Sequence, residues 1–426
     1  MWENERKKTI IRNVIIFLVL VAVAAGLLLA MIKVKSQIDA EDELLKAQSA
    51  SQRQELSEVR QENLDAIQIA YETDMETVRT YLPGVVCWGD SLTAGSSGNV
   101  SYPGTLQKYI NTYLCEIYDF SSTVENADEY SRLDWKKYTF SIPVVNMGAG
   151  KEDSVTVLGR SGVAPFVVGM DFEIPAEAES VSITLKSADG KDVTPLTAGN
   201  VGMNPVLIEG VSGTITLESE GLGRNTYRFT RTEAGEAVLI TKGTEIIPAS
   251  VDEYRDYLHI VWLGTYDSNS TPEQLVKDTK TLLSRQANNP ERYLVIGPCT
   301  VRGTWNGVSV TTLDAIDSAM LQAFGNNYIN VRKYLMTDGM TDAKISVSRE
   351  EKQVIAQGMV PNAFRSNATG ADLNGLAYKL IGKLVYERME GLGYFDEIRQ
   401  ELGLDKTTQE ILKTNPKYFE NILNAK

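Results

Sequence analysis

The sequence predicts an α/β protein: a three-layer, mostly parallel sheet with an inserted small β-sandwich, preceded by a transmembrane helix and a helical stalk. Three observations support this prediction. A long apolar run near the start of the chain is followed by a charged segment that lacks glycine and proline. Farther on, short apolar runs alternate with helical patterns, which is typical of parallel sheets covered by helices. A stretch in the middle of the chain changes to a period of two, which indicates antiparallel strands.

The apolar run predicts a transmembrane helix over residues 14–34. No charged residue interrupts it from Val14 to Ile32, and at 1.5 Å per residue these residues span roughly 28 Å, enough to cross the bilayer core. A cleaved signal peptide is the alternative, because Ala22-Val23-Ala24 resembles a small-residue cleavage site. The run continues through Met31, which favours an uncleaved anchor.

The charges on either side of this run predict its orientation. Residues 1–13 contain the basic side chains Arg6, Lys7, Lys8 and Arg12, whereas acidic residues follow soon after the run. Because basic flanks stay on the cytoplasmic side, residues 1–13 are expected inside. The protein is therefore predicted to be a single-pass protein of the cell membrane, with the bulk of the chain extracytoplasmic.

Residues 35–82 are predicted to form the helical stalk. Apolar residues recur at steps of three and four from Leu64 to Leu82, and Pro83-Gly84 then ends the pattern. The interval from Leu45 to Leu56 is too polar for a strong zipper. A weak homodimer through a coiled coil and a solitary stalk therefore both remain open.

Composition excludes several classes of function. A net charge of −14 argues against nucleic acid as a partner, because no basic surface is available for phosphates. Three cysteines, Cys87, Cys115 and Cys299, do not make a disulfide framework and are expected to be buried free thiols. The chain has one histidine, His259, which excludes most histidine-based metal sites. No cofactor and no metal are expected.

The α/β domain is predicted over residues 83–153 and 251–392. Its strands are expected at the apolar runs of residues 85–88, 144–147, 259–263, 293–296 and 328–331. Helices are expected over residues 102–118, 272–286, 313–324 and 374–390, and a polar loop over residues 337–369. Residues 154–250 are predicted to be the inserted β domain, and residues 393–426 a C-terminal helical segment.

The first strand of this domain leads directly into a candidate nucleophile. The run ends at Gly89, and Asp90 and Ser91 follow before a helical pattern begins. Parallel α/β folds carry their chemistry at the carboxyl edge of the sheet. A serine at this edge, with its N–H close to a helix start, is well placed as a nucleophile beside an oxyanion site.

In four blocks the chain resembles the SGNH (GDSL-type) serine hydrolases, over about residues 84–150 and 255–392. Gly89-Asp90-Ser91-Leu92 resembles the block with the nucleophilic serine. Asn146-Met147-Gly148-Ala149-Gly150 resembles the block in which a glycine N–H helps to bind the oxyanion. Gly264-Thr265-Tyr266-Asp267 is similar to the Gly-x-Asn-Asp block, and residues 369–375 to the Asp-x-x-His block. The resemblance implies removal of acyl or acetyl groups from glycans, lipids or small esters, with Ser91, Gly148 and Asp372 as catalytic residues.

Three replacements depart from the family pattern. Tyr266 stands in place of the oxyanion asparagine, Thr369 in place of the orienting aspartate, and Asp372 in place of the histidine base. His259 cannot replace that base, because it begins a strand whose far end borders the site, roughly 16 Å away. An aspartate is poorly matched to a serine hydroxyl unless burial raises its pKa.

Three hypotheses of function follow. The first is an ester hydrolase with an atypical base, acting on an acylated glycan or a small ester. The second is a pseudoenzyme that binds an envelope glycan or a protein. The third is an envelope scaffold in which the stalk and the β domain carry the role.

Overall fold

The computed structural model describes residues 2–96, 100–113, 142–220, 225–267, 270–299, 304–305, 308–366 and 372–402. The chain divides into two compact units. The first unit comprises residues 1–71 and 121–131, and the second comprises the rest of the chain.

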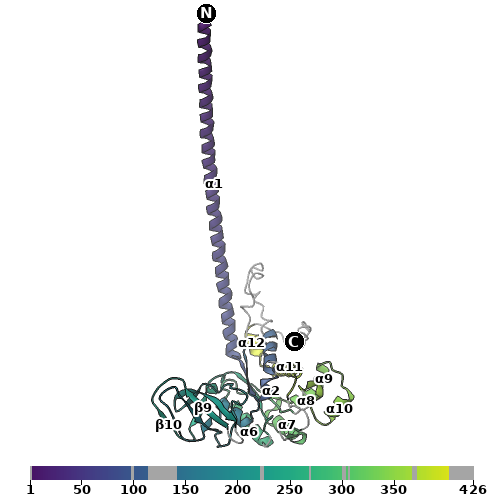
Figure 1. Cartoon of the computed structure of the whole chain (residues 1–426). Coiled ribbons are helices and arrows are strands. Elements are labelled where there is room, and N and C mark those ends of the chain that lie inside the picture. The colour runs from purple at the N-terminus through teal and green to yellow at the C-terminus, as the bar shows by residue number, and fades with distance from the viewer. Residues whose placement is uncertain are drawn as a thin grey trace. The chain divides into compact units, whose positions relative to one another are not determined.

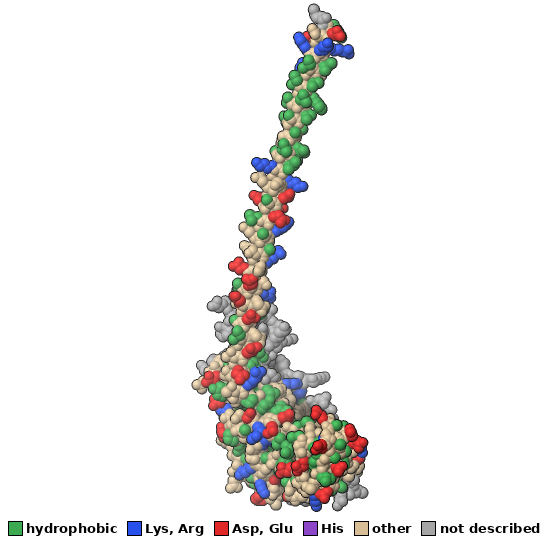
Figure 2. Space-filling view, turned by 90° about the vertical axis from the view of Figure 1, so that its left-hand side faces the viewer, with side chains coloured by type: hydrophobic (Ala, Val, Ile, Leu, Met, Phe, Trp, Pro, Cys, Tyr) green, Lys and Arg blue, Asp and Glu red, His purple; other side chains and the backbone are tan. Residues whose placement is uncertain are grey.

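The described part of the first unit is residues 2–71, which belong to helix α1 (Trp2–Tyr81). The last residues of this helix, from Glu72 on, belong to the second unit. The predicted transmembrane segment and stalk form one uninterrupted helix (Figure 1). Figure 2 shows a band of apolar side chains between the basic residues near its start and the charged residues that follow. By length and composition this helix could cross a membrane, and a signal sequence near the N-terminus would meet the same two criteria. The orientation of the chain in a membrane stays a prediction.

The second unit begins with the last turns of α1. Met75, Val78 and Leu82 are buried there, which explains why apolar residues recur at three- and four-residue steps in this part of the helix. The helix ends at Tyr81, before Pro83, as the sequence predicts.

A five-stranded parallel sheet forms the centre of the second unit. Its order is β16-β13-β12-β1-β2. The strands are β1 (Val85–Gly89), β2 (Val144–Gly148), β12 (Leu258–Trp262), β13 (Tyr293–Ile296) and β16 (Tyr328–Ile329). Every residue of β1 and β12 is buried, as expected for strands with helices on both faces.

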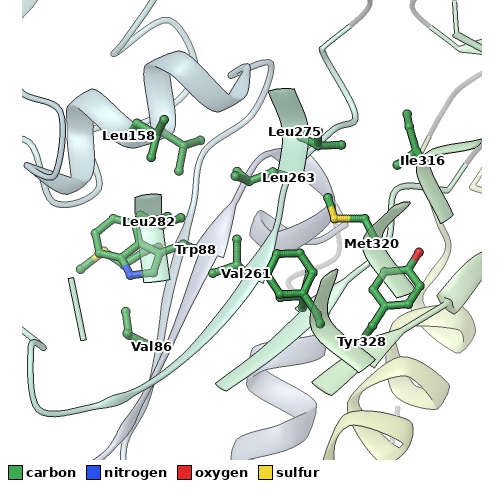
Figure 3. Packing of buried hydrophobic residues seen from close by; sticks show 14 of the residues in the cluster. Val86, Trp88, Leu158, Val261, Leu263, Leu275, Leu282, Ile316, Met320 and Tyr328 are labelled. Atoms are coloured by element: carbon green, nitrogen blue, oxygen red, sulfur yellow. The ribbon is translucent and has the colours of Figure 1, made fainter. Parts of the chain in front are cut away.

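One face of this sheet is covered by three helices. Trp88 of β1 and Val261 of β12 lie on this face, within one apolar core (Figure 3). Leu158, Leu282 and Met320 complete the contact from the helices. The helices are α5 (Ser154–Ser161), α6 (Pro272–Leu283) and α7 (Val310–Phe324).

The opposite face is covered by α3 (Tyr102–Tyr113) and α11 (Gly375–Gly391). Because side chains alternate along a strand, Trp262 points away from Val261, and its ring centroid lies 5.6 Å from that of Tyr102. Tyr109 of α3 stacks on Tyr386 of α11 at 5.7 Å. The predicted parallel α/β architecture is therefore confirmed.

The inserted segment is antiparallel β structure. Seven strands pair in the order β5-β9-β8-β7-β11-β3-β6, and β10 pairs with β4 in a separate two-stranded sheet. Both sheets contribute to one apolar core, in which Ile174 and Ile240 meet Phe166 and Phe229. A β-sandwich in the strict sense stays a prediction. The strands are β3 (Phe166–Val168), β4 (Phe172–Ile174), β5 (Ser180–Ile183), β6 (Leu185–Lys186), β7 (Val206–Ile208), β8 (Val211–Glu220), β9 (Asn225–Arg231), β10 (Val238–Ile240) and β11 (Glu245–Pro248).

The β structure begins later than the predicted boundary at residue 154. Residues 154–161 form α5, because Asp153 caps its first turn by accepting the Thr156 N–H at 2.9 Å and Gly162 ends it in the left-handed conformation. The alternation of valine with serine and threonine from Ser154 to Val157 imitates a strand.

The polar region of residues 337–369, predicted to be a loop, contains short helices. They are α9 (Asp338–Asp342), α10 (Arg349–Ala356) and the 3₁₀ turn η5 (Asn362–Phe364). The remaining elements are α2 (Ser91–Ala94), η3 (Ala249–Val251), β14 (Thr304–Trp305), β15 (Val308–Ser309), η4 (Gly325–Asn327), α8 (Val331–Met336) and α12 (Asp396–Glu401). Of the predicted C-terminal helical segment, residues 403–426 lie outside the described residues.

Candidate functional site

Ser91 lies where β1 ends and α2 begins. Gly89 is the last residue of the strand, and Ser91 is the first residue of the helix. A Cβ atom at Gly89 would lie 2.2 Å from Thr93 Oγ1 and 2.5 Å from the Trp262 carbonyl oxygen. Glycine is therefore required for α2 to fold back against the sheet. The turn places Ser91 at the carboxyl edge of the sheet, half-buried, as the sequence predicts.

Asp90 points inward from this turn. Its side chain is fully buried, and Oδ1 accepts the Leu92 N–H at 2.9 Å, which caps α2. Burial raises the pKa of this carboxyl to about 7, and the nearby charge of Asp267 adds to the rise, while hydrogen bonds from Thr265 and Leu92 partly offset it. Asp90 therefore stabilises the turn by capping α2, and its carboxyl group is only partly ionised near neutral pH.

The hydroxyl of Ser91 is paired with a phenol. Ser91 Oγ lies 3.0 Å from Tyr266 Oη, and either atom can donate. Burial raises the pKa of Tyr266, and the charges of Asp90 and Asp372 add to this, while the hydrogen bond with Ser91 lowers it. The phenol consequently stays protonated near neutral pH and is a weak proton acceptor.

The loop that carries Tyr266 is anchored by its neighbour Asp267. The Asp267 carboxylate accepts the Ser154 N–H at 3.0 Å and the Ser154 hydroxyl at 2.5 Å. The same hydroxyl lies 3.1 Å from Asp278. Burial raises the pKa of Asp267 to about 6. This buried contact fixes the loop to the start of α5 and so holds Tyr266 beside Ser91.

Gly148 is the last residue of β2, next to α2. Its N–H donates to Asn146 Oδ1 at 2.9 Å. A Cβ atom at Gly148 would lie 2.1 Å from the backbone nitrogen of Ala94. Packing of α2 therefore requires glycine here, and the amide that the resemblance assigns to an oxyanion site is bonded to Asn146.

Asp372 lies just before α11, and its side chain is exposed. Its carbonyl oxygen accepts the Ser366 N–H at 3.0 Å, and Asn374 caps α11 by accepting the Ala377 N–H. The charge of Asp372 reaches Tyr266 and raises the pKa of that phenol. Among the described residues, the Asp372 carboxylate makes no hydrogen bond to Ser91. Thr369, the predicted replacement of the orienting aspartate, lies outside the described residues.

His259 lies at the opposite end of the sheet from Ser91. It pairs with Val86 near the start of β1, whereas Gly89 pairs with Trp262 at the far end. The imidazole is buried, and Nε2 lies 3.1 Å from the Tyr254 carbonyl oxygen. Burial lowers the pKa of His259 to about 4. Because the sequence contains no other histidine, no imidazole can activate Ser91.

The described residues contain neither a cluster suited to a metal ion nor an exposed cysteine thiol. Within the ranges given above, no group of three or more His, Cys, Asp or Glu side chains is arranged to hold a metal ion. Cys87 and Cys299 are buried free thiols, and burial raises the pKa of Cys87 to about 12. Cys115 lies outside the described residues.

No family model and no curated protein matches the chain. One similar solved structure is a peptidoglycan O-acetylesterase, which is 12% identical over 75% of this chain and 95% of that chain, with a TM-score of 0.27. The similarity is too weak to assign a family. The roles of Ser91 and its neighbours therefore depend on the geometry described above.

Proposed function

We propose that this chain is a membrane-anchored, extracytoplasmic protein whose SGNH-hydrolase-like domain binds a ligand through the Ser91–Tyr266 hydroxyl pair. We propose further that its ester hydrolysis is lost or strongly weakened. One observation carries the proposal: the partner of the Ser91 hydroxyl is a phenol with a raised pKa, 3.0 Å away.

A serine hydroxyl becomes a nucleophile when a nearby group takes its proton. None of the four candidate acceptors is suited to this task. The Tyr266 phenol would have to be deprotonated first, and the Asp90 carboxylate is turned toward the Leu92 N–H. Within the described residues, the exposed Asp372 carboxylate makes no hydrogen bond to Ser91, and His259 is at the other end of the strand. General-base assistance is worth about 10²- to 10⁴-fold, so its loss leaves at most slow turnover.

Two neighbouring hydroxyls remain well suited to binding. Each can donate and accept a hydrogen bond, which matches the hydroxyl and acetyl groups of a glycan. The net charge of −14 disfavours a polyanionic ligand. Acetylated envelope glycan is therefore the ligand class that we propose.

A slow ester hydrolase is the second candidate. The specific observation in its favour is the position of Ser91, at the end of a buried strand and at the first residue of a helix. If Ser91 donates to Tyr266, the phenol can take the Ser91 proton and give its own to the departing alkoxide, while the Ser91 oxygen bonds the acyl carbon and the ester C–O bond breaks.

Labelling and binding experiments on the purified full chain separate these candidates. We expect no labelling of Ser91 by a fluorophosphonate, no hydrolysis of an acetyl ester above background, and retention of the chain on acetylated glycan. Ser91→Ala and Tyr266→Phe should each weaken glycan binding, whereas the surface control Ser212→Ala should not. Ester turnover that Ser91→Ala abolishes would support the second candidate and contradict the first.

Restoring an imidazole tests whether the missing base is the reason for weak or absent ester hydrolysis at Ser91. Asp372→His places the family's base beside the start of α11, in a segment already held by backbone contacts. Ester turnover should rise by about 10²-fold or more over the wild type. Asp372→Asn is the matched control and should stay inactive. An inactive but folded Asp372→His variant would show that the loss of the base is not the limiting defect.

A further inference from the structure

The exposed part of α1 between the apolar band and residue 62 carries a heptad pattern. Every residue from 35 to 62 is solvent-exposed in the single chain. Isolated helices in water gain most of their stability from packing an apolar face, and this stretch has no such contact within the described chain. A partner that covers one face would supply it.

Four of the five large apolar residues of this stretch occupy a and d positions, which form the contact line, or seam, of a coiled coil; the fifth, Leu44, lies outside it at a c position. Ile38, Leu45 and Val59 are spaced by multiples of seven, and Leu56 precedes Val59 by three. With Ile38, Leu45 and Val59 at d positions, Leu56 occupies an a position. Their exposed fractions are 53%, 61%, 50% and 69%, in the order Ile38, Leu45, Val59, Leu56. The other seam positions are polar: Asp42 and Ser49 at a and Gln52 at d, of which the charged Asp42 would face its own copy in a parallel dimer, and they keep the seam weak.

The charges beside the seam decide which partner fits. Glu41 and Glu55 occupy g positions, and Lys46 and Arg60 occupy e positions. In a parallel dimer each g residue faces the e residue five places later on the partner, which sets Glu41 against Lys46 and Glu55 against Arg60. Twofold symmetry repeats both pairs.

An antiparallel pair of the same helices would be opposed by these charges. There g positions face g positions and e positions face e positions, so glutamates would oppose glutamates and basic residues would oppose basic residues. In the part of the chain that the structure describes, Glu41, Glu55 and Arg60 form no ion pair, and Lys46 forms one exposed pair with Glu43 at 3.5 Å. The charges are therefore available to a partner helix.

We infer that residues 38–62 form a parallel, two-stranded coiled coil with a second copy of this chain. Self-complementary e and g charges specify an identical, parallel partner, and a common membrane anchor would hold two copies in that direction. Anchoring also raises the local concentration, which makes a weak seam sufficient. The inference is independent of what the Ser91 site does.

Disulfide crosslinking of the full chain in lipid vesicles tests the seam. Ser49→Cys places a thiol at an a position, and Ala47→Cys places one on the outer face as the matched control. Cys115→Ser is introduced in both variants to remove the third native thiol, and Cys87 and Cys299 are buried. We expect covalent dimers through position 49 and at least fivefold fewer through position 47. Equal yields at the two positions, or none at position 49, would overturn the inference.

Charge reversal tests the identity and direction of the partner. The pair of changes Glu41→Lys and Glu55→Lys makes both flanks basic, and Lys46→Glu with Arg60→Glu makes both acidic. Each double variant should lose crosslinking through Ser49→Cys by about tenfold, because four attractive contacts become repulsive. Mixing the two double variants in one vesicle should restore crosslinked dimers that contain one chain of each kind. Crosslinking that does not depend on these charge reversals, or crosslinked products whose mass is not twice that of the chain, would overturn the inference that the stalk pairs with a second copy.

Discussion

Replacing Asp90 by asparagine should make the protein more stable at pH 8 and leave its stability almost unchanged at pH 4. Asparagine has nearly the same shape as a protonated aspartate and can still accept the Leu92 N–H that caps α2. The difference lies in the charge. Burial raises the pKa of Asp90 from its ordinary value of 3.8 to about 7, so ionising this side chain inside the folded protein is unfavourable.

The size of the effect follows from the two pKa values. Between pH 4 and pH 7 the folded state retains the proton that the unfolded state has released, so the free energy of unfolding of the wild type falls as the pH rises through this window. A shift of about 3 pKa units corresponds to about 4 kcal/mol, since each unit is worth 1.36 kcal/mol. The asparagine side chain of the Asp90→Asn variant does not titrate, so its free energy of unfolding does not fall in this way between pH 4 and pH 7.

Urea unfolding followed by tryptophan fluorescence measures this difference, because Trp88 and Trp262 are buried in the same domain. The stability of Asp90→Asn minus that of the wild type should grow from near zero at pH 4 to about 4 kcal/mol at pH 8. Asp189→Asn is the control: its exposed carboxyl has a pKa lowered by hydrogen bonds from Lys191 and Ser187, so its difference should be flat from pH 5 to pH 8. A flat or negative difference for Asp90→Asn would refute the assignment of Asp90 as a buried, unfavourably ionised carboxyl.

Three further substitutions test other parts of the fold by the same unfolding assay. Gly148→Ala should destabilise the protein by about 1–3 kcal/mol or more, because its Cβ would lie 2.1 Å from a backbone atom, whereas Gly150→Ala, whose nearest new contact is 3.2 Å, should be close to neutral. Arg160→Met should cost about 3–5 kcal/mol, because it leaves Glu152 buried without the guanidinium that donates to it at 2.8 Å. His259→Gln should remove about 3 kcal/mol of acid sensitivity between pH 6.5 and pH 4, since the buried imidazole has a pKa of about 4 and the unfolded one is protonated first. A steep acid limb that persists in His259→Gln would contradict this last expectation.

The sequence predicted the parts of the fold in which local signals and tertiary packing agree. The apolar runs that became β1 and β12 are buried on both sides, so their composition alone identified them. It failed at α5, where β-branched residues alternate with polar ones although capping and packing impose a helix. The short polar helices α9 and α10 were missed, because neither contains an apolar stripe long enough to predict a helix.

The candidate site was only partly accessible to sequence reasoning. Ser91 could be placed, because a buried strand followed by glycine determines where the next side chains lie. Its contact with Tyr266 could not, since it joins residues 175 positions apart and depends on how the Asp267 loop is anchored to Ser154. Tyr266 stood out only as a departure from the family pattern, and the hydroxyl pair became visible when two strand ends were placed side by side.

Packing alone accounts for most of the residues that make this chain resemble a hydrolase. Gly89 and Gly148 leave no room for a Cβ atom beside α2, and Asp90 caps that helix from a buried position. The two glycines, and a side chain at position 90 that can cap α2, would be needed in an inactive protein of the same fold. Ser91 is different: its side chain is half-buried at the sheet edge, and its hydroxyl bonds a tyrosine rather than the helix or the strand. Ser91 and Tyr266 are therefore the residues whose role packing does not explain. Substitutions there should alter ligand binding or turnover with little effect on the stability of the domain.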